Sequence, residues 1–169
     1  GFAIGSAVLT SLALLTAFQK AVSVKGTDLS VDIIANAKVM PGLLIGGVLP
    51  FVFSGFTMLA VGRSAGSIIE EVRRQFRNGI LEGLVKPDYA ACVDIATRAS
   101  LKEMVAPGVM AVIVPIMVGI FMGPEALAGV LTGSIVSGST MAIMMANAGG
   151  AWDNCKKYVE AGAHGGKGS

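Results

Sequence analysis

The sequence predicts an all-α fold, a polytopic membrane helical bundle with four transmembrane helices. More than half of the 169 residues are hydrophobic (53%) and only 14% are charged, whereas a soluble domain averages about 25% charged residues. Apolar segments recur at about the length of 20 residues that a helix needs to cross a bilayer. They lack the polar stripe that marks helices at the surface of a soluble bundle. Together these observations favour a membrane protein.

Four apolar segments are predicted to span the membrane, at residues 2–18, 40–61, 104–122 and 126–148. The last three reach the required length and the first is shorter. Pro41 falls in the first turn of the second segment, where proline is tolerated. Pro107 and Pro115 lie within the third segment. The alternative, buried helices of a soluble bundle, is disfavoured because the fourth segment carries only small hydroxyl residues as its polar side chains.

Basic residues are distributed unevenly among the connections. Seven lie within residues 62–102, three (Lys20, Lys25 and Lys38) lie between the first two segments, and none lies at 123–125. The positive-inside rule therefore predicts that residues 62–102 form a cytosolic connection. The segments then alternate in direction, so Gly1 and residues 153–157 lie on the same cytosolic side, and we expect them to be near each other.

The cytosolic connection has helical character at both ends. Residues 67–76 continue the second segment as a helix, with Glu70 and Arg74 spaced for an ion pair. Asn78-Gly79 predicts a break. The next helix is predicted to begin after Pro87-Asp88, and residues 89–103 are predicted to form a helix that leads into the third segment.

Small residues recur every four positions in the fourth segment. One row holds Gly129, Gly133 and Ser137, and the other holds Ser134, Gly138, Ala142 and Ala146. Gly1 and Gly5 repeat the pattern in the first segment, and Gly42, Gly46, Pro50 and Ser54 share one face of the second. Such rows let helices approach closely in lipid. The third segment is mostly Val, Ile and Met, so we expect it to face lipid while the first and fourth lie inside the bundle.

Several classes of protein and site are disfavoured. A formal charge of +2 without a basic, aromatic-rich stripe argues against nucleic acid binding. Cys92 and Cys155 lie far apart, which suggests neither a disulfide framework nor a zinc site. The first apolar segment is not expected to be a signal peptide, because no charged region precedes a cleavage site, and both ends of the sequence resemble cuts through a longer protein. No charged residue lies in the middle of a segment, so the charged part of any ion path is expected on other helices.

The candidate site follows the fourth segment. Asp153 lies 27 residues after Ala126, about 40 Å along a helix and therefore beyond the hydrocarbon core of roughly 30 Å. Asp153 offers hard oxygen atoms to Mg²⁺, and Lys156, on the same helical face, offers a point charge to a phosphate oxygen. The alternative is a surface ion pair between Asp153 and Lys156 or Lys157.

Residues 149–158 (GGAWDNCKKY) resemble a signature of the membrane-integral pyrophosphatases, which couple pyrophosphate hydrolysis to ion transport. Further blocks resemble the family in the same order. They are GFAIGSA, PGLLIGGVLPFVFSGFTMLAVG, EEVRRQF, PDYAACVDIATRASLKEMVAPG and SGSTMAIMMANAGG. The resemblance implies a 16-helix homodimer that binds magnesium-pyrophosphate in a cytosolic funnel. It assigns Asp153 to Mg²⁺ and Lys156 to pyrophosphate, with Asn154 and Lys157 as supporting neighbours.

The resemblance also defines what this chain lacks. A substrate-binding lysine directly before GFAIGSA, the aspartates that hold the nucleophilic water and the ion gate all fall outside residues 1–169, so the chain alone is expected to be inactive. Whether H⁺ or Na⁺ is pumped, and whether K⁺ activates, depends on those other parts. The expected location is a prokaryotic inner membrane. The alternatives are a fragment of a secondary transporter or channel without hydrolytic activity, and a non-catalytic membrane scaffold.

Overall fold

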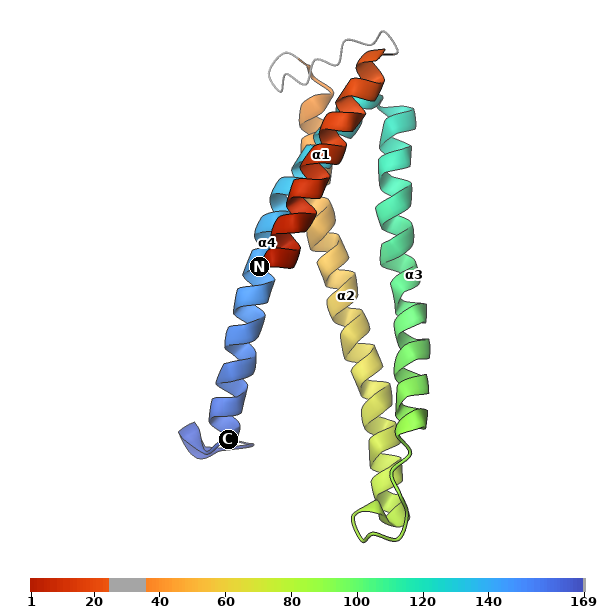
Figure 1. Cartoon of the computed structure of the whole chain (residues 1–169), viewed down its shortest axis with the longest axis vertical. Coiled ribbons are helices and arrows are strands. Elements are labelled where there is room, and N and C mark those ends of the chain that lie inside the picture. Colours follow the sequence, from red (N-terminus) through yellow and green to blue (C-terminus); the bar gives the residue numbers. More distant parts are fainter. Residues whose placement is uncertain (25–35, 169) are drawn as a thin grey trace. The chain divides into compact units, whose positions relative to one another are not determined.

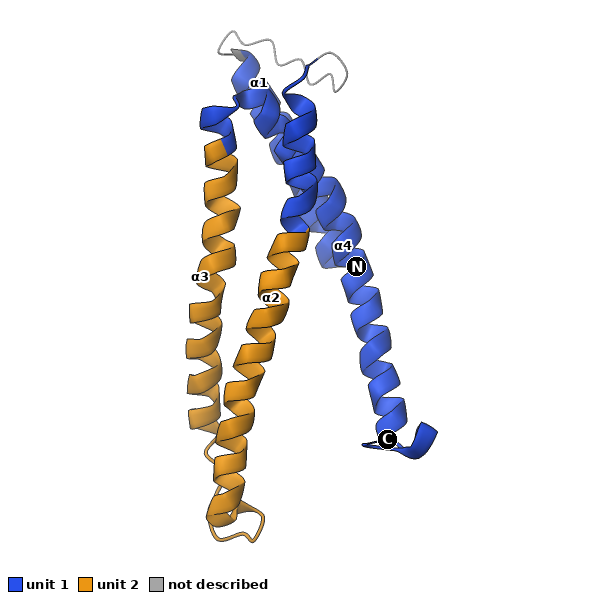
Figure 2. Cartoon of the chain, turned by 180° about the vertical axis from the view of Figure 1, so that it is seen from behind, with its two compact units in different colours: residues 1–50, 118–169 blue, residues 51–117 orange. Residues whose placement is uncertain are grey.

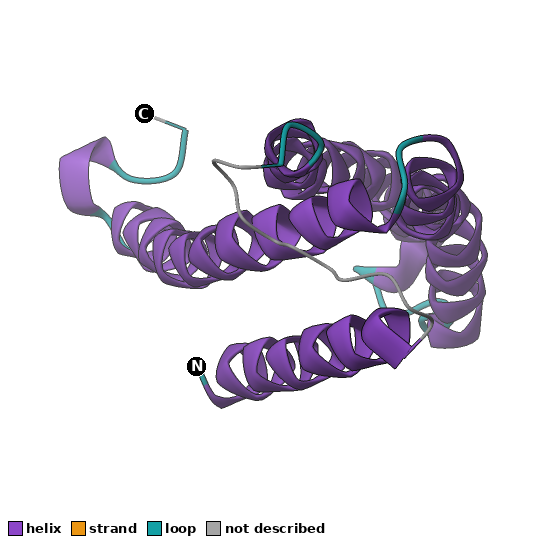
Figure 3. Cartoon of the chain, turned by 90° about the horizontal axis from the view of Figure 1, so that it is seen from above, coloured by secondary structure: helices purple, strands orange, loops and turns teal. Residues whose placement is uncertain are grey.

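The computed structural model describes residues 1–24 and 36–168, and the regular elements in this part of the chain are all helical (Figure 3). The long helices are α1 (Phe2–Val24), α2 (Val39–Gln75), α3 (Tyr89–Phe121) and α4 (Pro124–Glu160) (Figure 1). Two short helical elements, η1 (Phe76–Ile80) and η2 (Ala163–Gly165), follow α2 and α4 respectively. Each long helix is long and apolar enough to cross a membrane. The all-α, four-span prediction is confirmed. Lys25 lies outside the described residues.

Each predicted span overlaps a longer helix, and only the third, 104–122, runs one residue beyond the end of its helix, α3. Helices α2 and α4 have 37 residues each, about 55 Å, whereas the hydrocarbon core measures roughly 30 Å. Both helices therefore extend well beyond the bilayer. The first segment is also longer than predicted, because α1 continues through Gln19 and Lys20 to Val24. Polar residues end a hydrophobic pattern without ending a helix.

The chain divides into two compact units, residues 1–50 with 118–169 and residues 51–117 (Figure 2). The second unit is an antiparallel hairpin of α2 and α3. Gly79 breaks the first arm with a φ of 91°, a conformation that glycine adopts without a steric penalty. Asp88 begins the second arm, because its Oδ1 accepts a hydrogen bond from the Ala91 N–H at 3.0 Å. Both predicted boundaries are confirmed.

Polar contacts join the arms of the hairpin at two places. Arg63 Nε donates to Glu103 Oε1 at 2.8 Å, and the Arg63 Nη2 atom donates to Glu103 Oε2. Nearer the tip, the buried Gln75 side chain accepts the Asp88 N–H at 2.9 Å and donates to the Asp88 carbonyl at 3.0 Å. Both contacts link residues far apart in the sequence and fix the pairing of the two helices.

The predicted ion pair between Glu70 and Arg74 is wrong. Arg74 instead pairs with Glu71, with Nη2–Oε1 at 2.7 Å and Nε–Oε2 at 2.8 Å. The Gln75 amide donates to the same Glu71 carboxylate at 2.8 Å. A spacing of three residues places side chains on one helical face as well as a spacing of four does. The second donor adds a hydrogen bond that Glu70 does not receive.

In the first unit, the start of α2 runs parallel to α4 at very short range. A Cβ atom built on Gly42 would lie 2.1 Å from the Ala126 carbonyl oxygen, and one on Gly46 would lie 2.1 Å from that of Val130. From the other side, a Cβ on Gly133 would lie 2.3 Å from the Leu43 carbonyl oxygen. Only glycine permits such backbone contact. The Gly129–Gly133 row of α4 therefore lies at a helix contact, as predicted, and the helix that it contacts is α2.

The second small-residue row of α4 lies toward α1, which runs antiparallel to α4, and also toward α2, because a Cβ built on Gly138 would lie 3.5 Å from Pro50 Cγ. Ser134, Gly138 and Ala142 line an open apolar groove of about 620 Å³ together with α1 residues such as Ala3 and Leu15. The directions of α1, α2 and α4 in this unit agree with alternating membrane passes. Gly1 and Gly5, by contrast, have no neighbour within 4 Å of a built Cβ in the described structure. The packing role predicted for them is not seen here.

Candidate functional site

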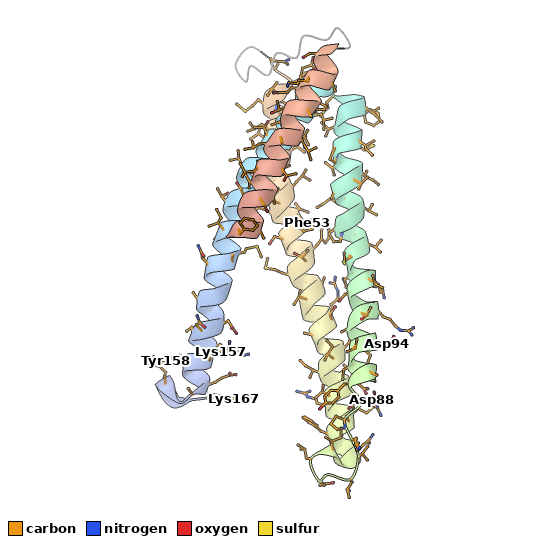
Figure 4. The ribbon with its side chains drawn as sticks, in the orientation of Figure 1. Phe53, Asp88, Asp94, Lys157, Tyr158 and Lys167 are labelled. Carbon is orange, nitrogen blue, oxygen red and sulfur yellow. The ribbon has the colours of Figure 1, made fainter. Side chains whose placement is uncertain are left out.

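The predicted site residues lie near the end of α4, which continues past the predicted span without an internal proline. Figure 4 shows the neighbouring Lys157, Tyr158 and Lys167 gathered at the end of α4 and in the segment that follows. Trp152 and Tyr158 are both exposed, and the Tyr158 ring meets His164 edge-on at a centroid distance of 6.2 Å. The cluster therefore lies on a solvent-facing helical extension.

Two ion pairs follow the helix surface at a spacing of four residues. Lys157 Nζ lies 2.7 Å from Asp153 Oδ2, and Lys156 Nζ lies 3.9 Å from Glu160 Oε1. Asp153 therefore pairs with Lys157, one of the two partners considered in the ion-pair alternative. Lys156 is directed to Glu160. In this arrangement, Asp153 and Lys156 share a helix end without contacting each other directly.

These contacts leave both functional groups available to a ligand. The side chains of Asp153 and Lys156 are 56% and 70% exposed. An exposed ion pair contributes only about 0–1 kcal/mol, so a divalent cation or a phosphate can displace either partner at small cost. The arrangement suits a site that is completed when substrate and metal arrive together.

A metal site needs more ligands than this segment supplies. Among residues 1–24 and 36–168, no three Asp, Glu, His or Cys side chains are grouped so that they could hold a metal ion. Mg²⁺ prefers about six oxygen ligands and takes many of them from water and substrate phosphates. The Asp153 carboxylate fits as one protein ligand of such an ion. Asn154 and Cys155 are exposed beside it.

The structure does not bring the start of α1 to this cluster. Ala3 lines the groove to which α4 contributes residues up to Ala142, and Asp153 lies 11 residues beyond Ala142 along α4, about 16 Å. Figure 1 shows the N-terminal end level with the middle of α4 along the long axis, well short of the C-terminal end of α4. The expected proximity of Gly1 to the site is therefore not seen in this structure, because α1 begins level with the middle of α4.

Sequence reasoning missed a polar contact between α4 and α2. The Ser134 hydroxyl donates to the Gly46 carbonyl of α2 at 3.1 Å. Sequence reasoning placed Ser134 in a packing row but assigned it no hydrogen-bond partner. Pro50 was the available signal in the sequence. Proline has no N–H, so the carbonyl of Gly46, four residues earlier, lacks its usual backbone donor.

Comparisons with known proteins agree with the resemblance. The family described as "Inorganic H+ pyrophosphatase" matches residues 1–169. A K(+)-insensitive pyrophosphate-energized proton pump from Methanosarcina mazei is 53% identical over 171 residues, covering 100% of this chain and 25% of that protein. A Clostridium tetani protein, provisionally named a K(+)-stimulated pyrophosphate-energized sodium pump, has the same identity and coverage.

A third relative shows the same relationship. The K(+)-insensitive pyrophosphate-energized proton pump of Chloroflexus aurantiacus is 49% identical over 179 residues, covering 99% of this chain and 23% of its own length. The chain thus spans about a quarter of the length of the curated relatives that it matches.

Proposed function

Because the chain belongs to the inorganic H+ pyrophosphatase family, we propose that the full-length protein hydrolyses pyrophosphate and uses the released free energy to move an ion across a membrane. The match over residues 1–169 carries this proposal, and the exposed charged end of α4 supports it. In this view, α4 contributes both to the membrane bundle and to the substrate site above it. The relatives named as proton and sodium pumps share the pyrophosphate substrate.

We propose separate roles for the charged residues of α4. Asp153 supplies a carboxylate oxygen to Mg²⁺, which screens the charge of pyrophosphate when bound. Lys156 leaves Glu160 and places its ammonium against a phosphate oxygen, where it stabilises the charge that develops during hydrolysis. Lys157 holds the Asp153 carboxylate in place, and Asn154 is a further supporting neighbour. The remaining ligands and the nucleophilic water belong to other parts of the protein.

The transported ion and the effect of K⁺ are proposed to depend on residues outside this chain. A relative named K(+)-insensitive proton pump and one provisionally named K(+)-stimulated sodium pump are equally similar to it, at 53% identity over 171 residues. Overall similarity in this region therefore does not separate the two kinds of pump.

Two further expectations concern the assembly. A homodimer in a prokaryotic inner membrane is proposed from the family resemblance, and the exposed apolar side chains of α1 and α3 are consistent with burial against other helices, a second copy or lipid. Chemical crosslinking of the protein in its native membrane, followed by mass measurement, tests the dimer. A product of monomer mass alone would contradict it.

The site proposal is tested in the full-length protein reconstituted in vesicles. We expect Asp153→Ala, Asp153→Asn and Lys156→Ala each to abolish most pyrophosphate hydrolysis and the coupled ion uptake, because each removes a charge that metal or substrate requires. Lys157→Ala, which removes only a supporting ion pair, should be milder. Hydrolysis and uptake are measured over a magnesium titration, with membrane-inserted protein quantified for each variant.

The outcomes distinguish the candidate functions. Near-normal activity of both Asp153→Ala and Lys156→Ala would reduce these residues to a surface role. Ion movement without any pyrophosphate hydrolysis by the unmodified protein would instead favour the secondary transporter or channel. Absence of both activities would favour the scaffold.

A further inference from the structure

The proline inside α2 creates a specific need for a hydrogen-bond donor. Pro50 has no N–H, so it cannot donate to the carbonyl of Gly46 four residues earlier. In a bilayer, water does not replace the lost donor, and neighbouring helices or hydroxyl side chains take over this role. The Ser134 hydroxyl of α4 donates to the Gly46 carbonyl at 3.1 Å. It replaces the backbone donor that proline removes.

Ser134 differs from the other hydroxyl residues on α4. Thr132, Ser137 and Thr140 all donate to carbonyls within α4, at 2.8, 2.9 and 3.0 Å, and Ser139 does the same at 3.0 Å. Of the α4 hydroxyls, Ser134 alone is seen to bond to another helix in the described structure. The close glycine contacts bring α2 near enough for this bond.

The glycine contacts alone do not define a unique register between α2 and α4. Gly42 and Gly46 are four residues apart, as are Gly129 and Gly133. Sliding one helix by one turn, about 5.4 Å, would again place small residues opposite each other. The Gly46 carbonyl distinguishes the two registers. The Gly42 carbonyl can accept the Gly46 N–H in a regular helix, whereas the Gly46 carbonyl has no backbone donor at Pro50 and needs one from another helix. A single polar contact can specify register in this way.

The register of α4 determines the height of the proposed substrate site. Helix α4 contains no internal proline, and Asp153 follows Ser134 by 19 residues, about 28 Å along the helix. A slip of one turn would displace Asp153 and Lys156 by about 5.4 Å, whereas a misplacement of about 1 Å is already harmful to catalysis.

We propose that Ser134 is a positioning residue. Its hydrogen bond to the carbonyl freed by Pro50 fixes the axial register of α4 against α2, and thereby the height of Asp153 and Lys156 above the bilayer. The second part of this inference rests on the proposed function of that pair. The hydrogen bond and the register are independent of it.

A double-mutant cycle between Ser134 and Pro50 tests the inference in the full-length protein. Ser134→Ala should lower kcat/KM for magnesium-pyrophosphate by about threefold, the size of a typical hydrogen bond between helices in lipid. Pro50→Ala restores the backbone donor at position 50, so adding Ser134→Ala to it should have little further effect. Ser134→Thr keeps the hydroxyl and should retain most activity. Ser137→Ala, which removes a hydroxyl bonded within α4, is the matched control.

The measurements separate positioning from general stability. Folded protein in each variant is quantified, and the half-saturating concentration of magnesium is expected to rise for Ser134→Ala but not for Ser137→Ala. If Ser134→Ala lowers kcat/KM by the same factor in the unmodified protein and in Pro50→Ala, the link to the freed carbonyl is refuted. Identical behaviour of Ser134→Ala and Ser137→Ala would refute the positioning role.

The cycle remains informative if the proposed function fails. Asp153→Ala and Lys156→Ala with normal hydrolysis would remove the link to the site. The free energies of unfolding of the unmodified protein, Ser134→Ala, Pro50→Ala and the double variant would still report whether Ser134 and Pro50 are coupled. An absence of coupling in that measurement would overturn the register itself.

Discussion

Replacing Gly42 by alanine tests the closest helix contact in the structure. A Cβ at this position would lie 2.1 Å from the Ala126 carbonyl oxygen and 2.8 Å from its carbonyl carbon. Neither atom belongs to a flexible side chain, so neither can rotate away. The neighbouring Gly47 provides a matched control, because a Cβ built there has nothing within 4 Å.

The expected magnitude follows from this geometry. Ordinary van der Waals contact begins near 3.4 Å, so Gly42→Ala requires α2 and α4 to separate by about 1.3 Å locally. Overpacking of this kind destabilises by about 1–3 kcal/mol. Alanine gains up to about 1 kcal/mol in helix propensity at either position, so the difference between Gly42→Ala and Gly47→Ala isolates the contact. We expect that difference to be about 1–3 kcal/mol.

The assay is the free energy of unfolding of the full-length protein, measured by denaturant titration in a mild detergent. Gly42→Ala should be less stable than the unmodified protein, and Gly47→Ala should be neutral or slightly more stable. Gly133→Ala, on the opposite side of the same contact, should resemble Gly42→Ala. Equal stability of Gly42→Ala and Gly47→Ala would refute the close approach of α2 and α4.

Two further predictions concern the hairpin and the topology. Arg63→Glu and Glu103→Arg should each destabilise the hairpin, while the two together should recover part of the loss; additive losses in unfolding experiments would argue against the pair. In an otherwise cysteine-free background, Lys20→Cys should react with an impermeant thiol reagent only from the outer side and Glu82→Cys only from the cytosolic side. The reverse pattern would invert the proposed orientation.

The helices were predictable from local signals. Apolar segments identified all four, although the first was shorter than a full span. Gly79 and Asp88 marked the ends of the hairpin arms, because a break or a cap depends on the residue itself. The exact ends of α1 were less predictable, since helix continues into polar sequence. The choice of Glu71 over Glu70 by Arg74 could not be predicted, because spacings of three and four residues are both suitable for an ion pair.

Contacts between distant residues were the least predictable. Small-residue rows indicated that α4 has two packing faces, but they did not say which helix covers each. The pairing of Arg63 with Glu103 joins positions 40 residues apart, and no local pattern relates them. At the candidate site, the motif identified Asp153 and Lys156, whereas their present partners depend on side-chain rotamers that the sequence leaves open.

The composition of α4 has a consequence for biogenesis. Of the four candidate spans in the described chain, α4 has the lowest hydropathy, because glycine, serine and threonine replace the larger apolar residues. Such a helix gains less from entering lipid by itself than the other three do. Its partner α2 is synthesised earlier and presents a glycine surface together with the Gly46 carbonyl. Stable integration of α4 should therefore depend on α2 already being in place, so that the helix with the proposed substrate ligands is retained only by a correctly assembled bundle.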